Sequence, residues 1–239
     1  MQDGESMEKK SAIRDTVYRY ISAAMNCSPD DLCADGIRFI QDERRADPYI
    51  KILSIHDADI VTVSEGLFDE VSAKLKGKSR DELYESSYVF GQTIHYIPDL
   101  NMMTPLPYPE EYTFELLAGS EIQRLNGLKG FEHALAFDEN GFTPTCIVLY
   151  AKDKDSVIAL AGASAENDEL REVGIDVKKE YRGKKLASIL VRNLSVEILR
   201  QGKVPFYSAS VTNLASQAAA VRSGYMPLWT DSYGVRGYE

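Results

Sequence analysis

The sequence predicts an α/β (α+β) fold in which a small α+β region, residues 1–111, precedes a second half, residues 112–239, of alternating strands and helices. Three observations carry this prediction. Short apolar runs rich in β-branched residues are bounded by charged or proline-containing turns. Longer stretches repeat apolar residues at helical spacing. Between the halves, Pro105, Pro107 and Pro109 favour a stiff, extended connector.

The first half is predicted to mix short helices with short strands. Ser79 followed by Glu82 is the pattern of a helix capping box, in which each residue satisfies a backbone N–H of the other. No residue in this half indicates a chemistry. Helices are expected at residues 12–25, 67–75 and from 80 onward, and strands at 49–55, 60–64 and 93–97.

The second half has stronger patterns. Leu186, Leu190, Leu194 and Ile198 are four residues apart and predict a long amphipathic helix with one buried face. The charged run at 152–155 predicts a hairpin turn between two apolar strands. Strands are expected at residues 112–117, 145–151, 157–162, 170–177, 205–211 and 225–230, and helices at 120–125, 130–136, 185–200 and 214–222.

Composition and charge exclude several classes of protein. The formal net charge is −10, and residues 1–111 carry 12 Lys and Arg against 21 Asp and Glu, so nucleic acid is not an expected partner. The apolar stretches are too short to cross a membrane. Three cysteines (Cys27, Cys33 and Cys146) and a polar N-terminal segment indicate a reducing, cytoplasmic setting, and their spacing indicates no metal site.

One junction indicates a ligand. A strand is expected to end at Val177, and Arg182-Gly-Lys-Lys-Leu-Ala187 then opens the long helix. The first amides of a helix are unpaired, and a glycine lets the backbone approach an anion closely, so this loop fits phosphate or pyrophosphate. A plain glycine turn with solvated lysines is the alternative. Walker and dinucleotide-binding loops need a glycine spacing that is absent here.

This junction resembles the GCN5-related N-acetyltransferase family, whose loop reads Gln/Arg-x-x-Gly-x-Gly/Ala. Arg182 and Ala187 match its ends, and Lys185 stands where the middle glycine is usual. The strand at 206–211 and the helix from Asn213 to the Gly-Tyr pair ending at Tyr225 also match. The resemblance implies the acyl-CoA N-acyltransferase fold for residues 112–239, with a mixed, largely antiparallel central sheet flanked by helices.

The resemblance also implies a site. Glu172 is the nearest carboxylate to the position of the family's base, although it lies one residue out of phase. The family's tyrosine acid falls on Ala220, so Tyr207, Ser208, Ser210 or water would return the proton. Phe131 and Glu132 would contact the acceptor. Acetyl-CoA would be bound by Ile175, Asp176, Val177, Arg182, Gly183, Lys184, Lys185, Leu186, Ala187, Ser188, Asn213 and Ser216.

The resulting hypothesis is an acetyl-CoA-dependent N-acetyltransferase without a metal. It would transfer an acetyl group to a primary amine of a small molecule by direct attack in a ternary complex, as a monomer or homodimer. A late acetyltransferase core behind an extra N-terminal region also resembles the zwittermicin-resistance-like branch. Two alternatives stay open. One is a non-catalytic protein that binds or senses acyl-CoA, and the other is a protein-lysine acetyltransferase.

Overall fold

The computed structural model describes residues 2–45 and 48–235 and divides the chain into two compact units. The first unit comprises residues 1–95, 209–213 and 227–239, and the second comprises 96–208 and 214–226. The chain therefore passes between the units several times, and residues 111 and 112 both lie in the second. The division into a region 1–111 and an acetyltransferase domain 112–239 stays a prediction about function.

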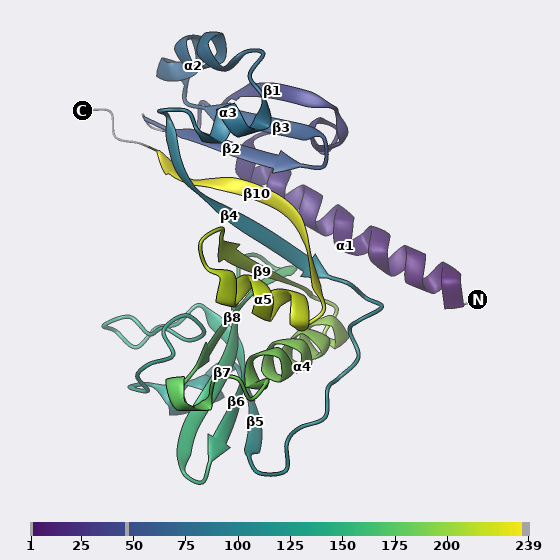
Figure 1. Cartoon of the computed structure of the whole chain (residues 1–239), viewed down its shortest axis with the longest axis vertical. Coiled ribbons are helices and arrows are strands. Elements are labelled where there is room, and N and C mark those ends of the chain that lie inside the picture. The colour runs from purple at the N-terminus through teal and green to yellow at the C-terminus, as the bar shows by residue number, and fades with distance from the viewer. Residues whose placement is uncertain (1, 46–47, 236–239) are drawn as a thin grey trace. The chain divides into compact units, whose positions relative to one another are not determined.

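The first unit is a mixed sheet with helices. Its strands follow the order β1-β3-β2-β10-β4 (Figure 1), with β1 parallel to β3 and β2 antiparallel to both β3 and β10. The structure adds a strand that the sequence analysis missed, β1, whose partly buried Ile37 and Phe39 alternate with exposed residues. The elements are α1 (Gln2–Met25), β1 (Gly36–Gln41), β2 (Ile50–Ile55), β3 (Ala58–Val63), α2 (Phe68–Leu75), α3 (Arg80–Tyr84), β4 (Val89–Pro98, to residue 95 in this unit) and β10 (Tyr225–Val235, from residue 227 in this unit).

Local signals in this unit are confirmed at several places. Ser79 caps α3, and Ser79 and Glu82 form both bonds of the capping box. The hairpin between β2 and β3 turns through His56 and Asp57 alone, because Ile55 already pairs with Ala58. The first helix begins ten residues earlier than expected, at Gln2.

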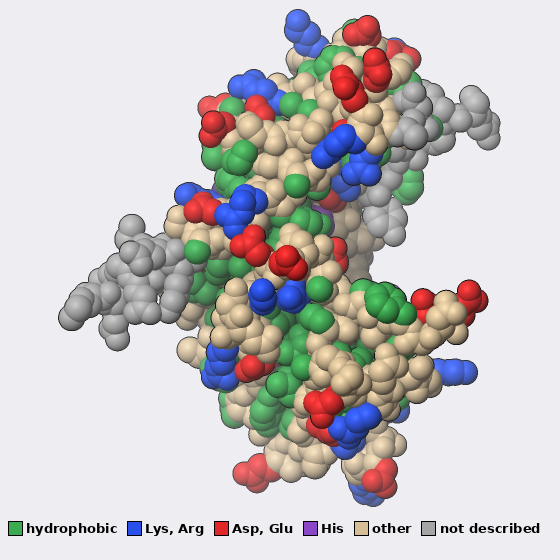
Figure 2. All heavy atoms as spheres, turned by 180° about the vertical axis from the view of Figure 1, so that it is seen from behind, with side chains coloured by type: hydrophobic (Ala, Val, Ile, Leu, Met, Phe, Trp, Pro, Cys, Tyr) green, Lys and Arg blue, Asp and Glu red, His purple; other side chains and the backbone are tan. Residues whose placement is uncertain are grey.

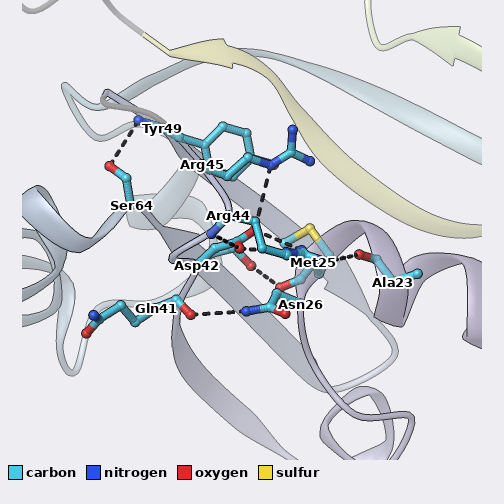
Figure 3. Close-up of polar contacts among 10 residues, drawn as sticks. Ala23, Met25, Asn26, Gln41, Asp42, Arg44, Arg45, Tyr49 and Ser64 are labelled. Carbon is cyan, nitrogen blue, oxygen red and sulfur yellow. Dashed lines mark hydrogen bonds and ion pairs between the residues drawn. The ribbon is translucent and has the colours of Figure 1, made fainter.

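A buried carboxylate ties together the segments that follow α1 and β1. Asp42 accepts hydrogen bonds from Nε and Nη2 of Arg44 at 2.7 and 2.8 Å, and these bonds lower the pKa of the carboxyl group (Figure 3). Arg44 also donates to the backbone oxygen of Ala23, near the end of α1. Asn26 donates to the backbone oxygen of Gln41. This network is satisfied internally and gives the unit a structural anchor.

The second unit contains an antiparallel sheet with one parallel edge. Its strand order is β9-β8-β7-β6-β5, and only the pair β8 and β9 is parallel. Helix α4 packs against β6, β7 and β8 (Figure 1). Its elements are β5 (Thr113–Ala118), β6 (Thr145–Asp153), β7 (Ser156–Ala165), β8 (Leu170–Val177), α4 (Leu186–Arg200), β9 (Val204–Ser210, to residue 208 in this unit) and α5 (Leu214–Arg222).

The mixed α+β class and the largely antiparallel sheet are thereby confirmed. The expected hairpin at 152–155 is present, since Asp153 pairs with Ser156. The helix expected over residues 130–136 is wrong, because this segment forms only a short turn. Two amides of this turn, those of His133 and Ala134, bond to a side chain of the sheet, as described below.

The surface mixes both signs of charge. Figure 2 shows Lys and Arg side chains interspersed with Asp and Glu over the visible face, with no large area of a single sign. None of the helices in the described part of the chain combines the length and the apolar character that crossing a bilayer requires. The described residues also contain no group of three His, Cys, Asp or Glu side chains placed to hold a metal ion.

Candidate functional site

The loop before α4 has the backbone geometry of an anion cradle. Gly183 has φ +80° and Lys185 has φ +63°, so two of the three residues before the helix lie in the left-handed region. Lys185 is the N-cap residue, and the first helical bond runs from the amide of Ile189 to its carbonyl oxygen. The amides of Leu186, Ala187 and Ser188 therefore have no acceptor within the helix.

The chain itself does not neutralise this helix end. Lys185 makes no side-chain cap, and the first turn of α4 contains no acidic residue. By contrast, α3 is capped by Ser79 and has two acidic residues in its first turn. Because a helix N-terminus carries partial positive charge, the uncapped end of α4 is suited to an anionic ligand.

A groove of about 810 Å³ opens beside this loop, entirely within the second unit. One side is a face of α4 and the other a face of α5, where small residues leave room between the helices. Part of the proline-rich connector forms a further wall, and Asn193 holds it to α4 by bonding both the amide and the carbonyl of Leu106, at 2.7 and 2.9 Å. The lining residues are Leu106, Pro107, Val177, Tyr181, Arg182, Gly183, Lys185, Leu186, Ala187, Ser188, Ile189, Arg192, Ala215, Ala219 and Arg222.

The charge of the groove is opposite to that of the protein. Four of its lining residues are basic and none is acidic, although the whole chain carries a net charge of −10. Within the described residues, no Asp or Glu forms an ion pair with any of these four. The groove is therefore suited to a polyanion with an apolar or aromatic part. The four basic residues are Arg182, Lys185, Arg192 and Arg222.

An open strand edge leads from the groove into the sheet. The parallel pairing of β8 and β9 covers only Leu170–Glu172 and Val204–Phe206, although β8 continues to Val177. From Val173 to Val177, β8 pairs only with β7 among the described strands. Beyond Glu172 the two strands therefore diverge, and this divergence opens the edge of β8. It leaves backbone groups of β8 available to an extended, amide-containing ligand.

Two polar pairs lie near this divergence. Ser208 of β9 donates a hydrogen bond from Oγ to Oε1 of Glu172, which is part-buried at the last paired position of β8. The hydroxyl groups of Tyr207 and Ser216 are 2.7 Å apart. Burial raises the pKa of Tyr207, so its phenol stays protonated near neutral pH. One carboxyl group and one protonated phenol thus lie near the divergence of the two strands.

The segment at 131–135 is seated on two facing glycines. Gly162 of β7 and Gly174 of β8 pair across the sheet, and a Cβ on either would lie 2.0 Å from a backbone oxygen of Ala134 or His133. Oδ2 of Asp176 accepts the amides of His133 and Ala134 at 2.8 and 3.1 Å. Burial raises the pKa of Asp176. The turn also has two backbone bonds of its own, from the amides of Ala134 and Leu135 to the carbonyl oxygen of Phe131.

The structure places other predicted residues in distinct surroundings. Phe131 is 1% exposed and packs in the core with Leu117 and Ile122, so its side chain has a packing role in this conformation. Glu132 is exposed on the same turn. Lys184 points to aromatic side chains rather than into the groove, because its Nζ donates to the hydroxyl of Tyr112 at 2.9 Å and lies over the ring of Tyr181.

Five residues predicted to bind the cofactor do not line the groove. They are Ile175, Asp176, Lys184, Asn213 and Ser216. Seven others do line it, from Val177 and the loop into α4. The catalytic candidate Ser210 is exposed in the first unit, where its Oγ lies 3.0 Å from Oγ1 of Thr212.

Comparison with known proteins assigns the family. A sequence model described as GNAT acetyltransferase matches residues 72–228, about two thirds of the chain. The chain belongs to the GNAT acetyltransferase family. The matched range begins within α2, before the expected boundary at residue 112, and ends in β10. Membership confirms the resemblance at the level of the superfamily, whose members use acetyl-CoA as acyl donor.

Solved GNAT structures show modest similarity to this chain. A GNAT-family protein from Novosphingobium aromaticivorans has 18% identity and a TM-score of 0.45, covering 59% of this chain and 63% of its own. A GCN5-related N-acetyltransferase-like protein from Streptococcus suis has 18% identity and a TM-score of 0.45, covering 72% and 70%. A GCN5-related N-acetyltransferase from Kribbella flavida has 16% identity and a TM-score of 0.46, covering 79% and 68%. The chain thus spans 63–70% of the lengths of these three relatives. Curated protein sequences gave no match.

Two departures from the GNAT pattern have a structural explanation. Lys185, in place of the usual middle glycine, keeps the left-handed backbone that a glycine would adopt and leaves its side chain exposed. Ala220, in place of the usual tyrosine, is fully buried on α5. Ser216 lies one turn before Ala220, so the phenol of Tyr207 reaches α5 on the face where GNAT proteins carry their tyrosine.

Sequence reasoning missed most of the groove wall beyond the loop. Arg192 could have been found, because it follows Lys185 by seven residues and so shares its face of α4. The same helical spacing puts on one face of α5 the three groove residues Ala215, Ala219 and Arg222. Nothing in the sequence indicates that Leu106 and Pro107 lie here, where Leu106 bonds to Asn193 through both its amide and its carbonyl oxygen.

Proposed function

We propose that this chain is an acetyl-CoA-dependent N-acetyltransferase whose acceptor is a primary amine of a small molecule. The observation that carries the proposal is the groove at the uncapped N-terminus of α4, lined by four basic residues and no acidic one in an acidic protein. Its size and charge fit a nucleotide-containing polyanion, and family membership supports acetyl-CoA in particular.

The residues present fit the parts of this donor. The amides of Leu186, Ala187 and Ser188, with Gly183 in its left-handed conformation, would hold the pyrophosphate. The open edge of β8 at Ile175 to Val177 would pair with the amides of the pantetheine arm. Val177, the last residue of β8, lines the groove beside the loop, which supports a single site for both parts of the donor.

The chemistry requires a neutral amine and a stabilised carbonyl oxygen. The amine nitrogen would attack the thioester carbon, the carbon–sulfur bond would break, and the products would be an amide and free coenzyme A. Glu172 would accept the proton that the amine loses. A backbone amide would stabilise the negative charge that develops on the carbonyl oxygen. Tyr207, protonated and bonded to Ser216, would return a proton to the thiolate.

The acceptor is inferred from charge. The protein carries a net charge of −10, and such a field favours the approach of cations such as protonated amines. Exposed Glu132 lies on the turn that Asp176 fixes to the sheet, where it could contact a cationic acceptor. The extra N-terminal unit supports a small-molecule acceptor rather than a protein lysine, as in the zwittermicin-resistance-like branch.

The proposal is tested first by calorimetric titration of the full chain with acetyl-CoA and, separately, with free coenzyme A. We expect saturable one-to-one binding of both. Thiol release in the presence of a panel of small primary amines then tests transfer. An absence of binding at millimolar ligand would remove the proposal.

Replacing Glu172 by glutamine is expected to lower kcat by about 100-fold, the smaller end of the usual effect of a general base. The affinity for acetyl-CoA should change by less than about twofold, because Glu172 does not line the groove. Glu139→Gln, in an exposed loop, is the control for the loss of one charge. Unchanged turnover at saturating substrate would show that another group is the base.

One observation favours a second candidate, a non-catalytic acyl-CoA-binding protein. Ala220 replaces the tyrosine that GNAT enzymes use as acid, and Tyr207 is buried away from the groove lining. Binding of acetyl-CoA without transfer to any amine of the panel would support this candidate. Transfer above the uncatalysed rate would exclude it.

A further inference from the structure

A second group of positive charge lies in the groove, away from the loop. Lys185, Ser188, Ile189 and Arg192 occupy one face of α4, and Arg192 is seven residues, or about 10 Å, further along the helix than Lys185. Across the groove, Arg222 lies in the last turn of α5, on the face that Ala219 shares. The groove therefore has basic residues at two separated places.

Arg192 is held rigidly where it meets the end of α5. Its side chain is 8% exposed. Nε donates to the backbone oxygen of Ser223 at 3.1 Å, and Nη2 donates to that of Arg222 at 3.0 Å. These are carbonyl groups that a helix C-terminus leaves unpaired. The bonds fix the plane of the guanidinium and place Arg222 beside it.

The charges of these two arginines are not compensated by the chain. No Asp or Glu of the described residues pairs with Arg192 or Arg222, although other arginines of the protein, such as Arg80 and Arg124, have carboxylate partners. A buried cation bonded only to carbonyl groups is costly to desolvate. An anion that enters the groove would remove that cost.

We propose that Arg192 and Arg222 form a second anion site, which binds the phosphate monoester on the adenosine ribose of coenzyme A. This inference rests on the proposed function and adds to the pyrophosphate cradle at the loop. Guanidinium groups bind phosphate through paired N–H donors, and a monoester carries nearly two negative charges at neutral pH. Leu106, Pro107 and Ala215 line the same groove and offer apolar surface for the nucleoside.

The test compares coenzyme A with 3′-dephospho-coenzyme A by calorimetric titration of the full chain. The unaltered protein should bind coenzyme A at least tenfold more tightly than the dephospho form. Arg222→Ala should lower the affinity for coenzyme A about tenfold and leave that for the dephospho form within twofold. Arg222 is exposed, so this variant should fold normally.

Arg200→Ala is the matched control, since Arg200 is an exposed arginine at the end of α4, as Arg222 is at the end of α5, and it pairs with Glu197 outside the groove. It should retain the full discrimination between the two ligands. Equal affinity of the unaltered protein for both would overturn the second anion site while leaving the proposed function intact. An equal loss of affinity for both ligands in Arg222→Ala would also overturn the second anion site. Failure of both ligands to bind the unaltered protein would remove the proposed function itself.

Discussion

Gly174→Ala is expected to destabilise the protein by about 3 kcal/mol, the upper part of the usual range for overpacking a core. A Cβ at this position would lie 2.0 Å from the backbone oxygen of His133, and a backbone atom cannot rotate out of the way as a side chain can. The turn that follows Phe131 would have to leave the sheet. It would also lose the two bonds to Asp176. Urea unfolding of the purified variant measures the effect.

Gly127→Ala separates this steric effect from backbone strain. Gly127 has φ +86° and open space around its Cβ position, so alanine there should cost only about 1 kcal/mol. Gly174 lies outside the left-handed region, and its variant should be clearly the less stable of the two. Equal losses would mean that the turn is not seated on the Gly162–Gly174 pair. Gly174→Ala should also be cleaved faster than the unaltered protein by proteases within residues 130–136.

Gly183→Val is expected to weaken the binding of acetyl-CoA by tenfold or more, equivalent to at least about 1.4 kcal/mol. Gly183 has φ +80°, a conformation that a β-branched residue avoids. No neighbouring atom lies within 4 Å of its Cβ position, so the change acts through the backbone. The loop would turn and redirect the amides that begin α4. Calorimetric titration with acetyl-CoA measures the loss.

Gly202→Val is the matched control at the other end of α4. Gly202 has φ +72° and equally open surroundings, but it does not line the groove. Both variants should lose a similar amount of stability, about 1–2 kcal/mol, because both force a valine into the left-handed region. Only Gly183→Val should lose affinity for acetyl-CoA. Unchanged affinity in that variant would contradict the position of the phosphate cradle.

Much of the fold could be predicted because its signals are local. Periodic leucines predicted α4, and the charged turn at 152–155 predicted the hairpin of β6 and β7. The capping box of Ser79 and Glu82 depends only on the backbone conformation of four consecutive residues, and it is present as expected. The loop at Gly183 belongs to the same class, since a strand end, a glycine and a helix start are adjacent in sequence.

The predictions that were wrong or incomplete involve long-range contacts. Residues 130–136 have helix-forming composition but form only a turn, in which the amides of His133 and Ala134 bond to the carboxylate of Asp176, some 40 positions later. The position of this turn on the sheet depends on Gly162 and Gly174, which pair with each other on the adjacent strands β7 and β8. Neither partner can be found by scanning a short window of sequence.

The class of fold, the family and the place proposed for an anion could be predicted from the sequence alone, because each depends on neighbouring residues whose backbone geometry is locally encoded. Only the tertiary structure decided how the groove is closed. It brought Arg192 against the end of α5, Asn193 against the proline-rich connector, and Tyr207 to Ser216 opposite the place of the missing tyrosine. These contacts join segments that are distant along the chain, and their energies arise from packing and desolvation, which no local pattern records.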